Sequence, residues 1–385
     1  MAESGEPSRR AAGLPRSAMP FVGPGARVAG ARPASMREPR GDSAGASGAG
    51  ATSGSATDPH LDVDRNEALG LYFALAVSRA ADARLDALAD EGRVPLAPLR
   101  PPLREAGVVG AAHALRRRDG GTGDVLAPTR RAAGALRLFG MGLNEFFQDH
   151  LAGDVGSVHG ETTELHRVDL QAGILAPVAP LGTVVEVMAG VTLAFRLRGE
   201  DRVGVVFDSD RASSTGAWHE GVVFAAARRC PMVLVVETTP SDAGFARPRD
   251  SRLSSYTQKG PGYGIPAVSV DGADVLAVVH AVRTAADLAR GGSGVHMVEI
   301  RYGEGVAAND PLLRLRALLL EREAVTAAEL DDLEREAGDR CEAAVERVLS
   351  APLPDRPERR PGGLVGDRPL DVRRRWASDH APQAM

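Results

Sequence analysis

The stretch VGVVFDSDRASSTGAWHEGVVFAAARRCPMVLVVETT, residues 203–239, decides the fold of this chain. Its apolar runs predict strands at Val203–Phe207 and Met232–Glu237, joined by one helix. A further strand is predicted near Val268. Strands that alternate with helices at this spacing indicate a parallel sheet whose working edge lies at the carboxyl ends of its strands. We therefore expect the functional groups around Asp210 and in the loop after the second strand.

Composition divides the 385-residue chain into three regions. Residues 1–60 are rich in Ala, Gly, Ser, Pro and Arg without apolar periodicity, which predicts a disordered segment. Residues 61–350 are predicted to form one α/β domain, and residues 351–385 an extended tail rich in Pro and Arg. Apolar periodicity predicts the remaining elements of the domain. These are helices over residues 66–91, 105–117, 131–151, 183–197, 273–290, 311–322 and 326–349, the last opened by a Thr-x-x-Glu capping box, and a strand over residues 295–301.

Charge and composition argue against several classes of partner. A net charge of -5 and an aromatic content of 4% do not favour nucleic-acid binding. No apolar run reaches the roughly 18 to 20 residues that cross a bilayer, so we expect no membrane contact. Two cysteines in a chain of this length are typical of a reducing compartment, and we predict a cytoplasmic protein. Arginine supplies almost all basic side chains, with Lys259 as the single lysine, a bias that we interpret as one of coding.

Several segments, taken in order, resemble one enzyme family. They are SRAADARL (residues 78–85), LREAGVVGAAHAL (103–115), APLGTVVEVMAG (179–190) and GPGYGIPAVSVDGADVLAVV (260–279). Their order and spacing are similar to those of the alpha subunit of the thiamine-diphosphate-dependent decarboxylating component of 2-oxo acid dehydrogenase complexes, especially the branched-chain type. The resemblance runs from about Leu69 to Leu349.

The resemblance implies the thiamine-diphosphate-binding fold, an α/β fold with a central, mostly parallel sheet flanked by helices. It also implies an α2β2 assembly with a beta subunit, in which thiamine diphosphate lies at the interface and the alpha chain holds the diphosphate through Mg²⁺. The implied reaction decarboxylates a 2-oxo acid and passes the acyl group to a lipoyl-bearing acyltransferase. The chain would therefore be active only with its partner.

The resemblance assigns the metal ligands to two places. The family's Gly-Asp-Gly motif is Ser209-Asp210-Arg211 here, so Asp210 is the expected carboxylate ligand of Mg²⁺. Both glycines are replaced, and Arg211 could either pair with a phosphate or occupy the metal position. The family's second ligand corresponds to Thr239 in a direct alignment, and to Asp242 if three residues are inserted. Threonine is a poor Mg²⁺ ligand and aspartate a good one.

Some of the family's other cofactor contacts are retained in this sequence and others are replaced. Arg131 is kept from a motif whose tyrosine and histidine are lost, and His166 occupies a family histidine position. Leu181 matches the apolar residue that supports the aminopyrimidine ring, and Gly182 follows it. Each of these residues taken alone has an ordinary structural interpretation, and only the set at family positions indicates a cofactor pocket or its remnant.

The largest departure from the family follows the strand that ends near residue 301. The family continues there with a long loop that carries its active-site histidine, whereas no histidine occurs between His296 and His380. Loss of such a general acid/base lowers a rate by about a hundred- to ten-thousand-fold. Two functions therefore remain open: an active alpha subunit, and a catalytically impaired pseudo-subunit kept for assembly or regulation.

Overall fold

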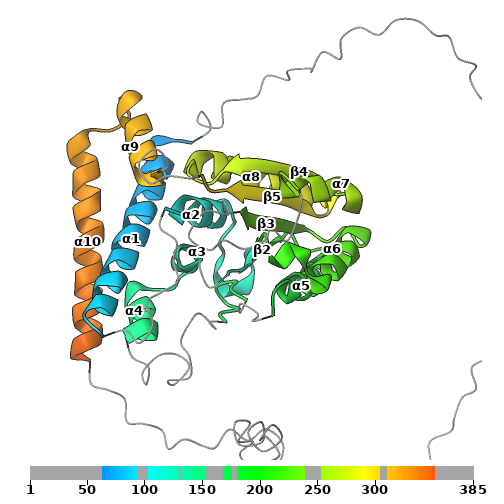
Figure 1. Cartoon of the computed structure of the whole chain (residues 1–385), viewed down its shortest axis with the longest axis horizontal. Coiled ribbons are helices and arrows are strands. Elements are labelled where there is room, and N and C mark those ends of the chain that lie inside the picture. The colour runs from blue at the N-terminus through cyan, green and yellow to red at the C-terminus, as the bar shows by residue number, and fades with distance from the viewer. Residues whose placement is uncertain are drawn as a thin grey trace, which may run out of the picture. The chain divides into compact units, whose positions relative to one another are not determined.

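A parallel sheet is the framework of this protein, as seen in a computed structural model. The structure describes residues 63–93, 103–129, 132–151, 168–175, 180–238, 253–303 and 310–351. In these residues five strands pair in the order β1-β2-β3-β5-β4, and every pairing is parallel (Figure 1). The strands are β1 (Val125–Ala127), β2 (Gly204–Ser209), β3 (Met232–Thr238), β4 (Ala267–Asp271) and β5 (His296–Arg301). The predicted α/β class is confirmed. The predicted disordered segment and tail lie outside the described residues, and the domain bounds remain a prediction.

Helices account for most of the other described residues. The longer ones are α1 (Arg65–Asp90), α2 (Glu105–His113), α3 (Ala133–Leu138), α4 (Leu143–Leu151), α5 (Thr183–Arg198), α6 (Gly216–Ala227), α8 (Val275–Leu288), α9 (Pro311–Glu321) and α10 (Ala327–Ser350). The short turns of helix are η1 (Asp119–Gly121), η2 (Ala212–Ser214), η3 (Tyr256–Lys259), α7 (Gly260–Tyr263) and η4 (Ala289–Ser293). No helix in the described ranges is both long enough and apolar enough to cross a membrane.

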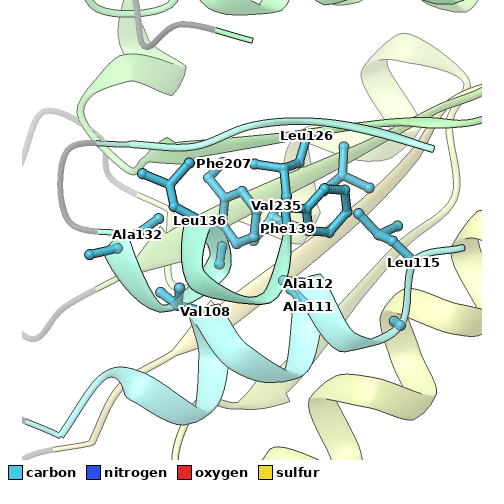
Figure 2. Packing of buried hydrophobic residues seen from close by; sticks show 14 of the residues in the cluster. Val108, Ala111, Ala112, Leu115, Leu126, Ala132, Leu136, Phe139, Phe207 and Val235 are labelled. Atoms are coloured by element: carbon cyan, nitrogen blue, oxygen red, sulfur yellow. The ribbon is translucent and has the colours of Figure 1, made fainter. Parts of the chain in front are cut away.

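The inner strands are covered on both faces, which explains their unbroken apolar runs. Successive residues of a strand point to opposite faces, so Phe207 enters one hydrophobic core and Val206 the other. On the first face, Phe207 and Val235 of the sheet pack with Leu136 and Val108, which come from α3 and α2 (Figure 2). Helices α5 and α6 cover the second face and bury Trp218 completely. Helices α1, α9 and α10 form a further layer beside α2 (Figure 1).

One helix predicted from the sequence is wrong in its extent. The predicted helix over residues 131–151 is two helices, α3 and α4, separated by a turn. Gly140 adopts a φ of 103° in this turn, a left-handed conformation that a continuous α-helix does not allow. The short strand β1 was not predicted, because three residues are too few to show a period. The capping box of the last helix is confirmed, since Thr326 accepts from the Glu329 amide and Glu329 accepts from the Thr326 amide.

A buried carboxylate joins three elements at the amino end of the sheet. Asp124 accepts hydrogen bonds from the amides of Arg116 and Val203, at 2.8 and 2.9 Å. Both oxygens also accept from the guanidinium of Arg290, at 3.0 and 2.9 Å. The side chains of Asp124 and Arg290 are 1% and 8% exposed. Because the two opposite charges are paired in this geometry, the pair fixes η4, which follows α8, against the residues that precede β1 and β2.

Replacing Asp124 with alanine is expected to lower the free energy of unfolding by about 3 to 5 kcal/mol, because the Arg290 charge would stay buried without its partner. Urea unfolding of the two proteins measures this loss. Asp201→Ala is the control: its carboxylate also faces Arg290, at 3.8 Å, but it is 58% exposed. The control should cost less than about 1 kcal/mol. Equal losses in the two variants would contradict the role given to Asp124.

Candidate functional site

The carboxyl ends of three neighbouring strands meet at one edge of the sheet. Ser209, at the end of β2, is in register with Glu237 of β3, and Glu237 is in register with Ile300 of β5. Beyond these positions the chain leaves the sheet in turns that carry polar side chains. Ligands of open parallel sheets bind outside this edge, so the candidate site is built here.

The turn after β2 presents Asp210 at this edge. The Asp210 amide continues the sheet by donating to the carbonyl of Glu237 at 3.2 Å. One carboxylate oxygen accepts from the Arg211 amide at 2.7 Å, and the Asp210 carbonyl accepts from the Ser213 hydroxyl at 2.6 Å. Asp210 is half-buried and Arg211 is exposed. The turn thus carries an acidic and a basic residue, adjacent in sequence, directly after the end of β2.

The backbone amides of this turn are engaged within the protein. The Ser209 amide donates to Asp208 Oδ1 at 2.9 Å, and the Ala212 amide donates to Ser209 Oγ at 3.3 Å. With the two amides described above, every amide from residue 209 to residue 212 has an acceptor. A diphosphate at this turn would therefore meet side chains, with Asp210 suited to a metal ion and Arg211 to phosphate oxygens. The side chains present fit such a group, whereas the amides are already taken.

The loop before α5 lies against the same turn. The hydroxyl of Thr215, at the start of α6, donates to the Ala212 carbonyl at 2.8 Å and lies 3.3 Å from the Leu181 carbonyl. Gly182 has a φ of 83°, and a Cβ there would collide with Thr215 Oγ1 and lie 2.8 Å from the Trp218 amide. Only glycine fits this position without displacing α6. The structure therefore brings Leu181 and Gly182 beside the turn of Asp210 and Arg211.

The other predicted site residues cannot be compared with the structure. Arg131, His166, Thr239 and Asp242 lie outside the described residues. The choice between Thr239 and Asp242 as the second metal ligand therefore stays open. In the ranges that the structure describes, no group of three or more His, Cys, Asp and Glu side chains is arranged to hold a metal ion.

Asp208 is a second carboxylate near this edge, and its environment is unlike that of Asp210. It is 6% exposed on β2, and Oδ2 has no hydrogen-bond partner among the residues that the structure describes. Burial, and to a lesser extent the charge of Glu237, raises the pKa of Asp208 to about 7. Its place after an apolar strand was visible in the sequence, but its burial was not.

Glu237 and Tyr302 form a buried pair that the sequence did not reveal. The Tyr302 hydroxyl donates to Glu237 Oε1 at 2.7 Å, and the two residues are 8% and 5% exposed. Burial, helped by the Glu237 charge, raises the pKa of Tyr302 well above its ordinary value. A Cβ at Gly107 would collide with the Tyr302 hydroxyl, so this glycine of α2 makes room for the ring. A tyrosine directly after the last strand was the available signal.

The fold and the edge described above define a class of protein, the α/β proteins that bind a ligand at the carboxyl ends of a parallel sheet. Comparison with known families is more specific. Residues 74–304 match the family described as dehydrogenase E1 component, which is more than half of the chain. The protein belongs to the dehydrogenase E1 component family.

Relatives of this chain are named as alpha subunits. The alpha subunit of acetoin:2,6-dichlorophenolindophenol oxidoreductase from Cupriavidus necator is 28% identical over 314 residues, 76% of this chain and 93% of the relative. The alpha subunit of 2-oxoisovalerate dehydrogenase from Bacillus subtilis is 29% identical over 241 residues, 62% and 71% of the two chains. The alpha subunit of the pyruvate dehydrogenase E1 component from Staphylococcus aureus is 34% identical over 145 residues, 37% and 39%. The alpha-subunit resemblance read from the sequence is thereby confirmed.

Asp208→Asn, studied in EDTA, is expected to change how stability depends on pH. The folded-state pKa of about 7 lies above the ordinary value of 3.8, so ionisation of Asp208 destabilises the folded protein as the pH rises. Relative to the variant, the wild type should lose up to about 1.4 kcal/mol of unfolding free energy per pH unit from about pH 4 to about pH 7, and little more above. Urea unfolding at several pH values measures the difference. A difference that does not vary with pH would show that Asp208 ionises normally.

Proposed function

We propose that this chain is the alpha subunit of a thiamine-diphosphate-dependent component that decarboxylates a 2-oxo acid and passes the acyl group to a lipoyl-bearing acyltransferase. The observation that carries the proposal is the position of Asp210, directly after β2 in the segment whose Thr215 contacts the Leu181 carbonyl. Membership of the E1 family supports it. We place the substrate in the branched-chain class on the resemblance of the motifs. We place the protein in the cytoplasm, consistent with Cys230 and Cys341 as buried free thiols.

The proposed cofactor contacts divide between metal and phosphate. Asp210 would hold Mg²⁺ together with Thr239 or Asp242, and Arg211 and Arg131 would pair with phosphate oxygens. His166, Leu181 and Gly182 would contact the rest of the cofactor at its family positions. Thiamine diphosphate, when bound, supplies a nucleophilic carbon and an electron sink for decarboxylation. The chain's own contribution is to bind and orient the diphosphate at the sheet edge.

A specific observation favours the alternative of an impaired pseudo-subunit. The family's two glycines are Ser209 and Arg211 here, and the amides of the turn are engaged by Asp208, Asp210 and Ser209. If the Arg211 guanidinium takes the place of the metal, the fold and the interfaces could persist without turnover. The two functions thus differ in what Arg211 does.

The outer side of α5 and α6 is the surface we propose for the beta subunit. Val223 and Phe224 of α6 are each 43% exposed, and Val187 of α5 is 44% exposed. The two helices pack against each other (Figure 1). Exposed apolar side chains on neighbouring helices are typical of a surface that another chain covers. His219 also lies on α6, where its ring is bonded to the Tyr263 hydroxyl at 2.9 Å, and we assign it a supporting role in this interface.

Calorimetry with thiamine diphosphate and Mg²⁺, on the chain co-purified with a beta subunit, tests the cofactor assignment. We expect binding, and an affinity at least about ten-fold weaker in Asp210→Ala, because the metal would lose a charged ligand. Arg211→Gly separates the two functions: it should weaken binding if Arg211 pairs with phosphate, and strengthen binding if Arg211 occupies the metal position. Absence of binding by the wild type at millimolar cofactor would overturn the proposal.

Phe224→Asp should weaken association with the beta subunit by about ten-fold or more, because a carboxylate would have to be buried in an apolar interface. Sedimentation of the mixed subunits measures the association. Leu313→Asp is the matched control, since Leu313 is also exposed, at 55%, but lies on α9, away from α5 and α6 (Figure 1). Unchanged assembly of the Phe224 variant would place the interface elsewhere.

A further inference from the structure

Lys259, the only lysine of the chain, reaches the turn that carries Asp210. It lies at the end of η3, and its ammonium donates to the carbonyl oxygen of Ser213. The same nitrogen is 3.2 Å from Ser213 Oγ. Ser213 belongs to the turn after β2 and is 3% exposed. A residue that follows the loop after β3 is thus bonded to the turn that follows β2.

Ser213 in turn is hydrogen-bonded to Asp210. Its hydroxyl donates to the Asp210 carbonyl at 2.6 Å, while the Asp210 amide is bonded to Glu237 of β3. The turn is therefore fixed at two points, at one by the sheet and at the other by Lys259 through Ser213. If the second point is lost, Ser213 no longer has the hydrogen bond that joins this turn to η3.

The surroundings of Lys259 favour an ammonium group in a fixed position. Its Nζ lies 5.2 Å from the centre of the Trp218 ring and 5.4 Å from that of Tyr256, distances at which a cation is attracted to a ring face. In the described part of the chain no carboxylate pairs with it. Burial lowers the pKa of Lys259, because removing the charged ammonium from water is unfavourable. The two rings and the Ser213 oxygens compensate that cost.

The composition of the chain suggests a structural reason for lysine, and not arginine, at position 259. The chain has 46 Lys and Arg residues, and Lys259 is the only lysine among them. Arginine has a planar, delocalised head with a fixed fork of donors, whereas lysine has a compact ammonium whose donors rotate. A single ammonium can donate to both Ser213 oxygens while it lies over the Trp218 and Tyr256 rings. The requirement for this shape gives a structural reason for lysine here in a chain that otherwise uses arginine.

We propose that Lys259 is a positioning residue, which through Ser213 holds the Asp210 turn in the geometry that presents the Asp210 carboxylate to a divalent metal ion. The role in metal binding rests on the proposed function. The hydrogen-bond chain from Lys259 through Ser213 to Asp210, here called the lock, does not rest on that function, because all of its contacts are within this chain.

Hydrogen exchange in the full chain without cofactor tests the lock itself. Lys259→Met keeps a long unbranched side chain, one atom shorter, and removes its donors. We expect the amides of Ser214 and Thr215, which are bonded to the Arg211 and Ala212 carbonyls, to exchange at least about ten-fold faster, with β3 unchanged. Ser213→Ala keeps the Lys259 bond to the Ser213 carbonyl but removes the hydroxyl that donates to Asp210, so it should also speed this exchange, and it serves if the lysine variant does not fold. Unchanged exchange in these variants would overturn the proposal.

Arg202→Met is the matched control for this experiment. Arg202 also lies over an aromatic ring, that of Phe195 at 4.1 Å, and donates to a carbonyl, that of Gly123 at 2.5 Å. It lies just before β2, at the opposite end of that strand from Asp210. Its replacement should leave the exchange of the Asp210 turn unchanged. If these amides exchange equally faster in Arg202→Met, the effect of Lys259→Met is a general loss of stability and not the loss of a specific contact.

A double-mutant cycle tests the role in metal binding. Calorimetry with Mg²⁺ and thiamine diphosphate, in the complex with the beta subunit, should show about ten-fold weaker binding for Lys259→Met and for Ser213→Ala. The double variant should bind about as weakly as either single variant, because both changes break one chain of contacts. If the loss of affinity in the double variant equals the product of the two single losses, Lys259 and Ser213 do not act through one chain of contacts. If the wild type binds no cofactor, the proposed function fails, and the exchange experiment still decides on the lock.

Discussion

The pairing of β2 with β3 is the constraint on which the rest of the site depends. The register continues to Ser209 and Glu237, and the Asp210 amide adds one more bond to the Glu237 carbonyl. Asp210 is therefore placed by the sheet before its side chain makes any contact. Because alternate residues of both strands pack in two different cores, a one-residue shift in register would move each side chain into the opposite core and disrupt its packing. The position of the carboxylate is thus secured by hydrophobic burial far from the edge.

The turn after β2 offers a ligand side chains, whereas a glycine-rich turn would offer backbone amides. A glycine-rich turn offers its amides to an anion, since no Cβ prevents close approach. Here the Ser209 amide is taken by Asp208, the Arg211 amide by Asp210 and the Ala212 amide by the Ser209 hydroxyl. What remains for a ligand is the chemistry of Asp210 and Arg211. This arrangement accounts for both proposed functions, because the same guanidinium can serve a phosphate or exclude a metal.

Buried carboxylates accumulate at this end of the sheet, and each meets a different environment. Glu237 accepts from Tyr302, and Glu299 accepts from the Ser255 hydroxyl and, at 3.2 Å, from the Tyr256 amide. Within the described ranges, Asp208 has a hydrogen bond to only one of its oxygens. The Glu237 charge also acts on Asp208 and disfavours its ionisation. Lys259 contributes a positive charge on the side of Trp218, but it is bonded to Ser213 and not to any of these carboxylates.

Local patterns in the sequence determined the α/β class, the strands β2 and β3, the capping box at Thr326 and the place of Asp210 directly after a strand. These features could be predicted because burial on a helix or strand imposes a period on neighbouring residues. Only the tertiary structure decided that residues 131–151 break at Gly140, that Tyr302 pairs with Glu237, and that Lys259 is bonded to Ser213, 46 residues earlier in the chain. Such contacts join residues that are distant in sequence and leave no period between them. Their existence depends on how the layers pack, which no single stretch of the sequence records.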